Sequence, residues 1–146
     1  MYRVTQRIRV EWSNCDPAGI IFNPYYYMWM DQGTHQLIEV CGFPFAEAVR
    51  TSDFRGCPLV TSSAEFLMPA LFSDVITLTT QVGKFGNKSF TMAHTFTRGE
   101  DLLARGSEVR VWAVSHPDDE TKMTGIPMSD DLKARLSTDG ETDVSP

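Results

Sequence analysis

Polar and apolar residues alternate along the first dozen positions of the chain. The apolar residues that share one face of residues 3–12 are Val4, Ile8, Val10 and Trp12. Arginine and glutamate side chains occupy the opposite face. Alternation with a period of two is typical of a β-strand with one buried face, so the N-terminus is predicted to be a half-buried strand.

The pattern changes to a helical one at Pro24, and a helix is predicted to run from there to Cys41. Asparagine is favoured just outside a helix and proline at its first position, so Asn23-Pro24 marks the start. Gly42 is suited to end the helix in a left-handed cap. The early turns are apolar or aromatic on all sides, which indicates a helix buried on most of its surface.

Four further strand-like runs follow a polar loop at residues 51–56. They span about 58–68, 75–84, 88–98 and 102–115. Each run alternates apolar and polar residues, and the connections between them are short, which predicts an antiparallel meander. A strand, a long buried helix and then four strands together predict an α+β fold.

One domain is expected to contain most of the chain. The 146 residues, 42% of them hydrophobic, are enough for a single substantial core. We assign residues 1–136 to this domain, with a short helix near 129–136, and expect 137–146 to be a disordered acidic tail. Residues 117–146 contain 8 acidic and 3 basic residues, whereas residues 1–116 contain 11 and 10. The net charge of −6 therefore comes mostly from the C-terminal segment.

Composition argues against several functional classes. The chain has no basic helix or basic-aromatic strand that could neutralise a nucleic-acid backbone. Its alternating, arginine-containing N-terminus is unlike a signal peptide or a membrane span. The three cysteines, Cys15, Cys41 and Cys57, form no metal-binding pair. We expect a cytoplasmic protein with reduced thiols, no bound metal, and no contact with nucleic acid or membranes.

Residues 15–26, CDPAGIIFNPYY, contain the strongest functional signal. Asp16 precedes Asn23 by seven residues, and Pro17–Gly19 favour a tight bend that could return its carboxylate to the helix start. The first amides of a helix lack internal partners and can hold an oxygen that becomes negative during a reaction. Asp16 and this helix start could therefore face one carbonyl group. The alternative is that Asp16 only hydrogen-bonds its own turn.

The same motif, with the WMD that follows it, resembles the 4-hydroxybenzoyl-CoA thioesterase family. The segments that support this between about Gln6 and Val114 are AEFLMPALFSDV, the KSF of Lys88–Phe90, and EVRVWAV. The resemblance implies a hotdog fold, in which an antiparallel sheet wraps around one long helix. It also implies hydrolysis of an acyl-CoA without a metal or redox cofactor, in a homodimer or homotetramer with active sites at the subunit interface. Aromatic acyl groups are the preferred substrates, and short or branched aliphatic groups stay open.

The resemblance also implies roles for individual residues. Asp16 would attack the thioester carbonyl or activate a water that does so, and the Asn23 amide would bind the developing oxyanion. The candidate substrate-binding residues are Gly19, Tyr26, Thr61 and Ser62, with Tyr26 lining the acyl pocket. The candidate CoA-binding residues are Lys84, Lys88 and Ser89. Aromatic-acyl members have a basic run before KSF, which is reduced here to Gly86-Asn87-Lys88, so other cations could contribute, namely Arg98, Arg105 or Arg110.

Two other functions stay open from the sequence. Hydratases and dehydratases of acyl thioesters share the fold but usually need a histidine beside the acid, and the first histidine here is His35. A non-catalytic acyl-CoA-binding or protein-binding module could hold a carbonyl without breaking the thioester. Among the other titratable groups, Asp31 is interpreted as a paired structural or interface acid. His94 alternates with apolar residues and is interpreted as a hydrogen-bonded core histidine.

Overall fold

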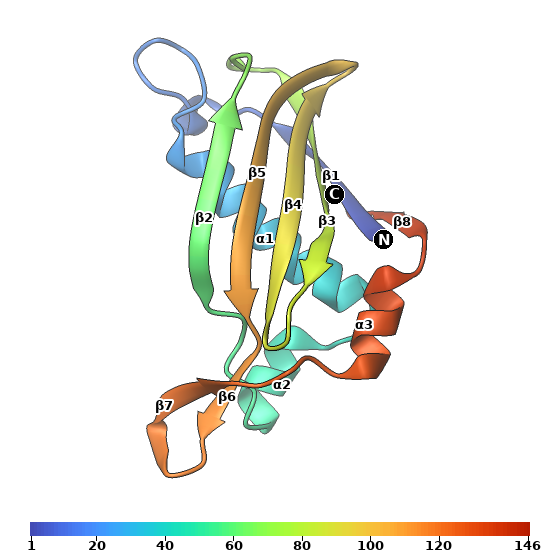
Figure 1. Ribbon diagram of the computed structural model, residues 1–146. Coiled ribbons are helices and arrows are strands. Elements are labelled where there is room, and N and C mark those ends of the chain that lie inside the picture. Colours follow the sequence, from blue (N-terminus) through green and yellow to red (C-terminus); the bar gives the residue numbers. More distant parts are fainter.

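A long helix lies against one face of a curved sheet in the computed structural model, which describes residues 1–146 (Figure 1). The strands of the main sheet are β1 (Tyr2–Arg9), β2 (Leu59–Phe66), β3 (Val75–Phe85), β4 (Ser89–Arg98), β5 (Asp101–Val111) and β8 (Gly140–Asp143). The helices are α1 (Pro24–Val40), α2 (Phe45–Thr51) and α3 (Asp130–Ser137). A hairpin of β6 (Ala113–His116) and β7 (Asp119–Gly125) projects from one end. The predicted α+β architecture is confirmed.

The sheet has the order β2-β5-β4-β3-β1-β8, so the predicted meander holds only for β3, β4 and β5. The prediction that β2 continues this meander is wrong, because β2 pairs with β5 at the edge and β3 pairs with β1. Residues 67–74 connect β2 to β3 across the end of the sheet. Eight extended residues span about 26 Å, more than the roughly 14 Å that separates strands three places apart. The connection is therefore long enough to pass the two strands that lie between them.

The first strand is shorter than predicted, and Trp12 does not belong to it. β1 ends at Arg9, and residues 12–14 form a 3-10 turn in which Trp12 is 70% exposed. The Glu11 amide donates to Asn14 Oδ1 at 2.8 Å, and the Asn14 amide donates to the Glu11 carbonyl at 2.9 Å. These local bonds compete with strand pairing and turn the chain before Trp12.

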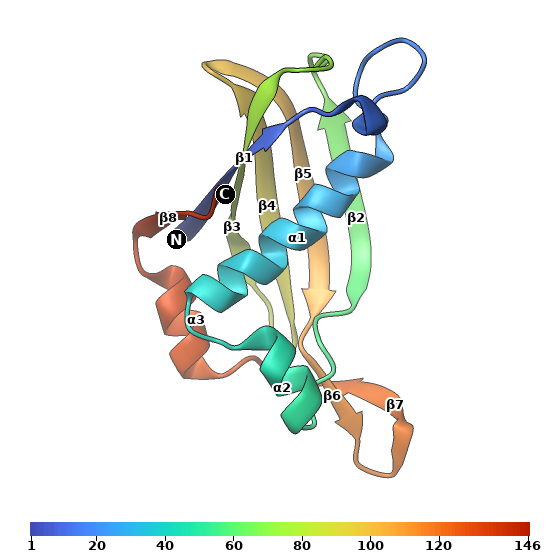
Figure 2. The same cartoon turned by 180° about the vertical axis from the view of Figure 1, so that it is seen from behind.

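The helix α1 begins and ends within one residue of the predicted bounds, but the prediction that it is buried on most sides is wrong. Within one chain it buries only the face that packs on the sheet, and Tyr27 and Met28 on its other side are exposed. Pro24 is its first residue, and Gly42 beyond its end has φ +89°, the left-handed conformation that glycine adopts readily. Its sheet-facing side includes Met30, Leu37 and Ile38, each at most 1% exposed. Figure 2 shows α1 crossing the full length of the sheet on its inner face. The start of α1 is thereby held at one end of the sheet and its last turn at the other.

The C-terminal segment is ordered, so the prediction of a disordered tail over 137–146 is wrong. After α3, which was predicted, residues 140–143 form β8 and pair in parallel with β1. The Met1 ammonium group contacts the Asp139 carboxylate at 2.8 Å, and the Tyr2 hydroxyl bonds the Thr142 hydroxyl at 2.8 Å. The unpaired edge of β1 supplies the partner that this polar segment needs to be a strand. None of the helices has the length and apolar character required to cross a membrane.

Candidate active site

The Asp16 loop is a closed turn that returns the chain beside itself. Cys15 and Ile21 face each other across an antiparallel bridge, and the Asp16 amide donates to the Ile20 carbonyl at 2.9 Å. Gly19 has φ +78° and donates its amide to the Asp16 carbonyl at 2.9 Å. The turn therefore places Asp16 beside Ile20, three residues before Asn23. The predicted bend at residues 17–19 is confirmed.

The Asp16 carboxylate has one occupied oxygen and one free oxygen. Its Oδ1 accepts the Ala18 amide at 2.8 Å, which is the contact with its own turn that the sequence left open. Its Oδ2 accepts no hydrogen bond within the chain, and the residue is half-buried. The turn contact fixes the side chain and leaves the second oxygen available to a substrate or a water.

The start of α1 presents an amide that has no partner in the chain. The Asn23 backbone is already helical, with φ −48° and ψ −39°, and its side chain makes no capping bond. The neighbouring amides are used, since Phe22 donates to the Asn14 carbonyl and Tyr25 to the Phe22 carbonyl. Pro24 has no N–H group. The Asn23 N–H is therefore the exposed positive end of the helix and can receive an oxyanion.

A small cavity opens beside this amide. Its volume is about 110 Å³. It lies between the Asp16 loop, the first turn of α1 and the chain that leaves β2, and its lining residues are Ile20, Ile21, Asn23, Tyr26, Phe66, Met68, Pro69 and Ala70. Two residues of the predicted site, Asn23 and Tyr26, thus line the same cavity. Apart from these two residues the lining is apolar.

The other predicted site residues lie apart from Asp16 within one chain. Lys84, Lys88 and Ser89 lie around the turn between β3 and β4, whereas the Asp16 loop lies at the opposite end of β3, where Phe72 donates to Gly19. The eleven residues of β3 span about 36 Å. Thr61 and Ser62 lie in β2 before its midpoint and face opposite sides of the sheet. Ser62 Oγ is buried without a hydrogen-bond partner.

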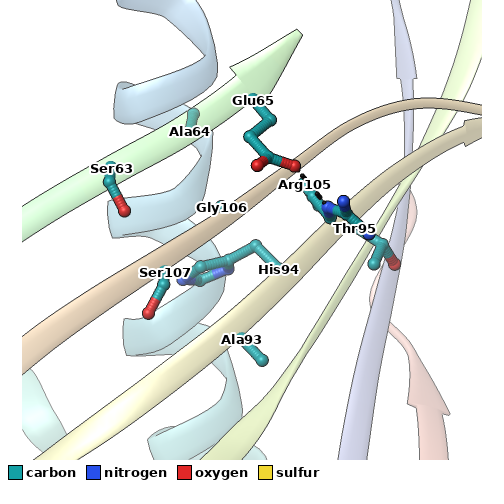
Figure 3. Close-up of a pocket in the computed structure, with 9 residues that line it drawn as sticks. All are labelled: Ser63, Ala64, Glu65, Ala93, His94, Thr95, Arg105, Gly106 and Ser107. Carbon is teal, nitrogen blue, oxygen red and sulfur yellow. Dashed lines mark hydrogen bonds and ion pairs between the residues drawn. The ribbon is translucent and has the colours of Figure 1, made fainter. Parts of the chain in front are cut away.

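The largest hollow in the molecule lies elsewhere, on the sheet face turned away from α1 (Figure 3). It has a volume of about 590 Å³, and its wall includes an ion pair of 2.6 Å between Glu65 and Arg105. None of its lining residues belongs to the Asp16 loop or to α1. This hollow is separate from the helix start.

A buried polar cluster lies under α1, and of its members only His94 was predicted to be a hydrogen-bonded core residue. Glu108, Arg110 and His94 are each at most 3% exposed. Glu108 Oε2 accepts from the Thr34 hydroxyl at 2.8 Å and lies 3.3 Å from His94 Nε2, while His94 Nδ1 lies 2.9 Å from Thr80 Oγ1. The interpretation of His94 as a hydrogen-bonded core residue is confirmed. We call Thr34, Thr80, His94, Glu108 and Arg110 the buried polar cluster.

Arg110 connects this cluster to the surface of α1. Its Nη2 donates to Glu108 Oε1 at 2.8 Å and to Asp31 Oδ1 at 2.6 Å. Asp31 is therefore a paired acid, as interpreted from the sequence. Arg110 is buried and its guanidinium is already bonded to Glu108 and Asp31, so the suggestion that it could bind CoA phosphates is wrong. Arg98 and Arg105 are also paired, with Asp74 and Glu65 respectively.

The charge state of Glu108 follows from its partners. Burial alone would raise the pKa of its carboxyl group, but hydrogen bonds from His94 and Arg110 and the charges of these partners lower the pKa to about 2. Glu108 is therefore ionised at neutral pH, opposite the Arg110 guanidinium. Neither His94 nor His35 supplies the histidine of a hydratase site, because His94 is held in this cluster and His35 packs on Phe45 with ring centres 4.6 Å apart.

Exposed apolar side chains lie beside the helix start and at both ends of the free edge of β2. These residues include Tyr27, Met28, Leu59, Val60, Phe66, Leu67 and Met68, each at least 36% exposed. The outer edge of β2 has no strand partner. An unpaired strand edge with exposed apolar side chains beside it is a feature of protein interfaces.

Comparisons with known proteins show the family and the fold of this chain. Residues 10–136 match the model of the thioesterase-like superfamily. The 4-hydroxybenzoyl-CoA thioesterase of Pseudomonas sp. (strain CBS-3) is 34% identical over 118 residues, which are 77% of this chain and 84% of that protein. A 1,4-dihydroxy-2-naphthoyl-CoA hydrolase of Prochlorococcus marinus is 26% identical over 102 residues, 67% of this chain and 68% of that protein.

Two solved structures show the same fold. A 4-hydroxybenzoyl CoA thioesterase mutant complexed with 4-hydroxybenzoyl CoA has a TM-score of 0.82 at 30% identity and covers 92% of this chain and 99% of its own. A gentisyl-coenzyme A thioesterase has a TM-score of 0.79 at 30% identity, and the match covers 91% of this chain and 99% of that protein. The predicted hotdog fold is confirmed. The chain belongs to the thioesterase-like superfamily and is a hotdog-fold thioester hydrolase.

Proposed function

We propose that this protein hydrolyses aromatic acyl-CoA thioesters, with Asp16 as the catalytic carboxylate and the Asn23 amide as the oxyanion site. The observation that carries the proposal is the pairing of an unoccupied amide at the start of α1 with a turn that brings the Asp16 carboxylate back beside the same segment. An amide positioned in advance for a developing negative charge contributes about 100- to 1000-fold to rate. Gly19 supports the turn by adopting the left-handed conformation.

The chemistry needs only groups that the chain provides and water. In one route Asp16 Oδ2 attacks the thioester carbon, the CoA thiolate leaves, and water hydrolyses the resulting anhydride. In the other, Asp16 takes a proton from a water that attacks the same carbon, and the tetrahedral intermediate expels the thiolate. In both routes the carbonyl oxygen becomes negative beside the Asn23 N–H. The products are a free acid and CoA.

The acyl group is assigned from the cavity and from the relatives. An apolar cavity of about 150 Å³ binds benzene in an engineered lysozyme, so the cavity of about 110 Å³ next to Asn23 suits a single ring or a short branched chain. The similar proteins named above act on hydroxybenzoyl-CoA and dihydroxynaphthoyl-CoA. The relatives therefore favour an aromatic acyl group, and the cavity volume limits it to about the size of one ring.

The test is an assay of the purified protein against aryl-CoA and alkyl-CoA thioesters, with the free thiol as readout. We expect the highest kcat/KM for single-ring aryl-CoA thioesters. Preference for aliphatic thioesters would contradict the aromatic assignment. Tight binding of acyl-CoA without thiol release would instead favour the non-catalytic module.

We propose in addition that the working form is a homodimer that pairs through β2 and shares its active sites. The free β2 edge and its apolar surroundings support this assembly. Antiparallel pairing of two β2 strands inverts the partner, so that its β3–β4 turn lies at the same end as this chain's Asp16. Lys84, Lys88 and Ser89 of one subunit would then bind the CoA whose thioester lies at Asp16 of the other. Thr61 and Ser62, on the paired strand, would lie near the bound pantetheine.

Replacing Val60 by aspartate is expected to separate this dimer. Val60 lies on the β2 edge and is 59% exposed, and a charge buried there without a partner opposes association. We expect light scattering to show the mass of one chain and kcat/KM to fall at least about 10-fold, the effect of about 1.4 kcal/mol of lost transition-state stabilisation. Val75→Asp is the matched control, because Val75 is 54% exposed on β3, away from the β2 edge. A wild-type protein that is monomeric and fully active would contradict the shared site.

A further inference from the structure

Tyr26 has a buried ring, and its hydroxyl group makes no hydrogen bond within the chain. The residue is 3% exposed, and its ring packs edge-on against Phe96, with centres 4.9 Å apart, and at a tilt against Phe66, at 5.1 Å. Unlike Ser62 Oγ, the hydroxyl oxygen of Tyr26 is not fully enclosed, so it faces the cavity that Tyr26 lines and can bond water there. Phenylalanine would fill the same space without presenting a polar group to the cavity. Packing therefore explains the ring of Tyr26 but not its hydroxyl group.

The position of Tyr26 gives the hydroxyl group a possible use. Tyr26 lies in the first turn of α1, where its amide donates to the Asn23 carbonyl at 3.1 Å, and both residues line the cavity beside the oxyanion amide. An acyl group whose carbonyl oxygen accepts the Asn23 N–H can extend its ring into this cavity. Tyr26 and Asn23 contribute the only polar side chains of the lining.

The surroundings of Tyr26 leave its hydroxyl group free for a ligand. Arg98 is the charged group that affects the pKa of Tyr26, and its guanidinium donates to the Asp74 carboxylate at 2.6 Å and to the Pro69 carbonyl at 3.4 Å. Burial raises the pKa of Tyr26, with a smaller opposing effect of Arg98, so the phenol is protonated and can donate as well as accept.

We infer that the Tyr26 hydroxyl group is a specificity determinant, which hydrogen-bonds a hydroxyl substituent on the aromatic ring of the acyl group. The inference rests on the proposed function, since it assumes that an aryl-CoA carbonyl docks at Asn23. A site that leaves a buried polar group unpaired discriminates against ligands that lack the matching group. Unsubstituted benzoyl-CoA would leave Tyr26 unsatisfied, whereas a hydroxybenzoyl group would pair with it.

The experiment compares Tyr26→Phe with wild type on benzoyl-CoA and on 2-, 3- and 4-hydroxybenzoyl-CoA. We expect wild type to prefer one hydroxylated isomer and the ratio of its kcat/KM to that of benzoyl-CoA to fall roughly 5- to 10-fold in the variant, as for loss of one hydrogen bond. Tyr25→Phe is the matched control, because it makes the same chemical change one residue earlier, at a ring that does not line the cavity. The control should leave the ratio unchanged.

Two further results separate the possible failures. A wild-type enzyme that hydrolyses aryl-CoA thioesters without preferring a hydroxylated ring, or a Tyr26→Phe variant that keeps the wild-type ratio, would overturn the role of Tyr26 and leave the proposed function standing. A wild-type protein that releases no thiol from any of the four substrates would remove the proposed function itself. The variant should unfold at a temperature no lower than wild type, because no internal hydrogen bond is lost.

Discussion

Replacing Asp16 by asparagine is expected to lower kcat for thioester hydrolysis by about 100- to 10,000-fold, the usual contribution of a positioned acid-base group. Asparagine has nearly the same shape but can neither attack the thioester carbon as a carboxylate nor take a proton from water. Its side-chain oxygen can still accept the Ala18 amide that Asp16 Oδ1 accepts at 2.8 Å. The loop should therefore keep its form, and steady-state kinetics with an aryl-CoA should report the chemical step.

The control for this variant is Asp53→Asn. Asp53 is an exposed aspartate whose backbone carbonyl, not its carboxylate, accepts the Ser115 amide. We expect its kcat to equal that of wild type, and both variants to unfold at the wild-type temperature. An Asp16→Asn variant that retains more than about a tenth of the wild-type kcat, well above the range for loss of a general base, would remove Asp16 from the mechanism.

Replacing Glu108 by alanine is expected to lower the free energy of unfolding by about 3–5 kcal/mol, as for other buried ion pairs that lose one partner. The change removes the acceptor that Thr34 and Arg110 share, and it leaves His94 Nε2 without a partner while His94 Nδ1 keeps Thr80. Arg110 keeps the Asp31 carboxylate and the Cys57 carbonyl but loses the buried charge opposite it. Urea unfolding followed by circular dichroism measures the loss.

Glu65→Ala makes the same change in an exposed ion pair and serves as the comparison. Glu65 contacts Arg105 at 2.6 Å, and both side chains are more than half exposed, so its loss should lower stability by no more than about 1 kcal/mol. Similar losses in the two variants would show that the buried polar cluster does not stabilise the core.

The buried carboxylate should also appear in the pH dependence of stability. The pKa of Glu108 is lowered from 4.5 to about 2 by folding, so its contribution is present above pH 4.5 and is lost as the pH falls towards 2. Glu108→Gln should therefore show a shallower loss of stability over this interval than wild type.

Local signals in the sequence predicted the parts of the fold that depend on local interactions. Asn23-Pro24 and Gly42 give the ends of α1 because capping and backbone conformation involve only a few adjacent residues. The pairing of β2 with β5 joins segments about 45 residues apart, and no local pattern specifies it. The strand β8 was missed for the same reason, since its polar residues become a strand only because β1 offers an edge.

The candidate site divides in a similar way. The motif around Asp16 predicted a bend and a helix start that are close in sequence, and the structure contains both. The buried polar cluster was missed because β5 inverts the usual pattern: charged Glu108 and Arg110 face α1, while Val109 and Val111 are only half-buried. Alternation indicates two faces, but it does not say which face is inside when a buried arginine and glutamate neutralise each other. Lys84 and Lys88 were grouped with Asp16 by motif, and their separation along β3 required the topology.

The short strand β8 bears on how far assembly through β2 can proceed. It covers β1, and its own outer edge has four residues, two of them acidic. Short, charged edge strands resist pairing with further chains. Each subunit would then have only one strand edge able to pair, the outer edge of β2. Association would stop at the dimer and would not continue into a fibre. Deleting residues 137–146 would uncover the edge of β1 as a second pairing edge. Dimers could then associate further into an open-ended polymer.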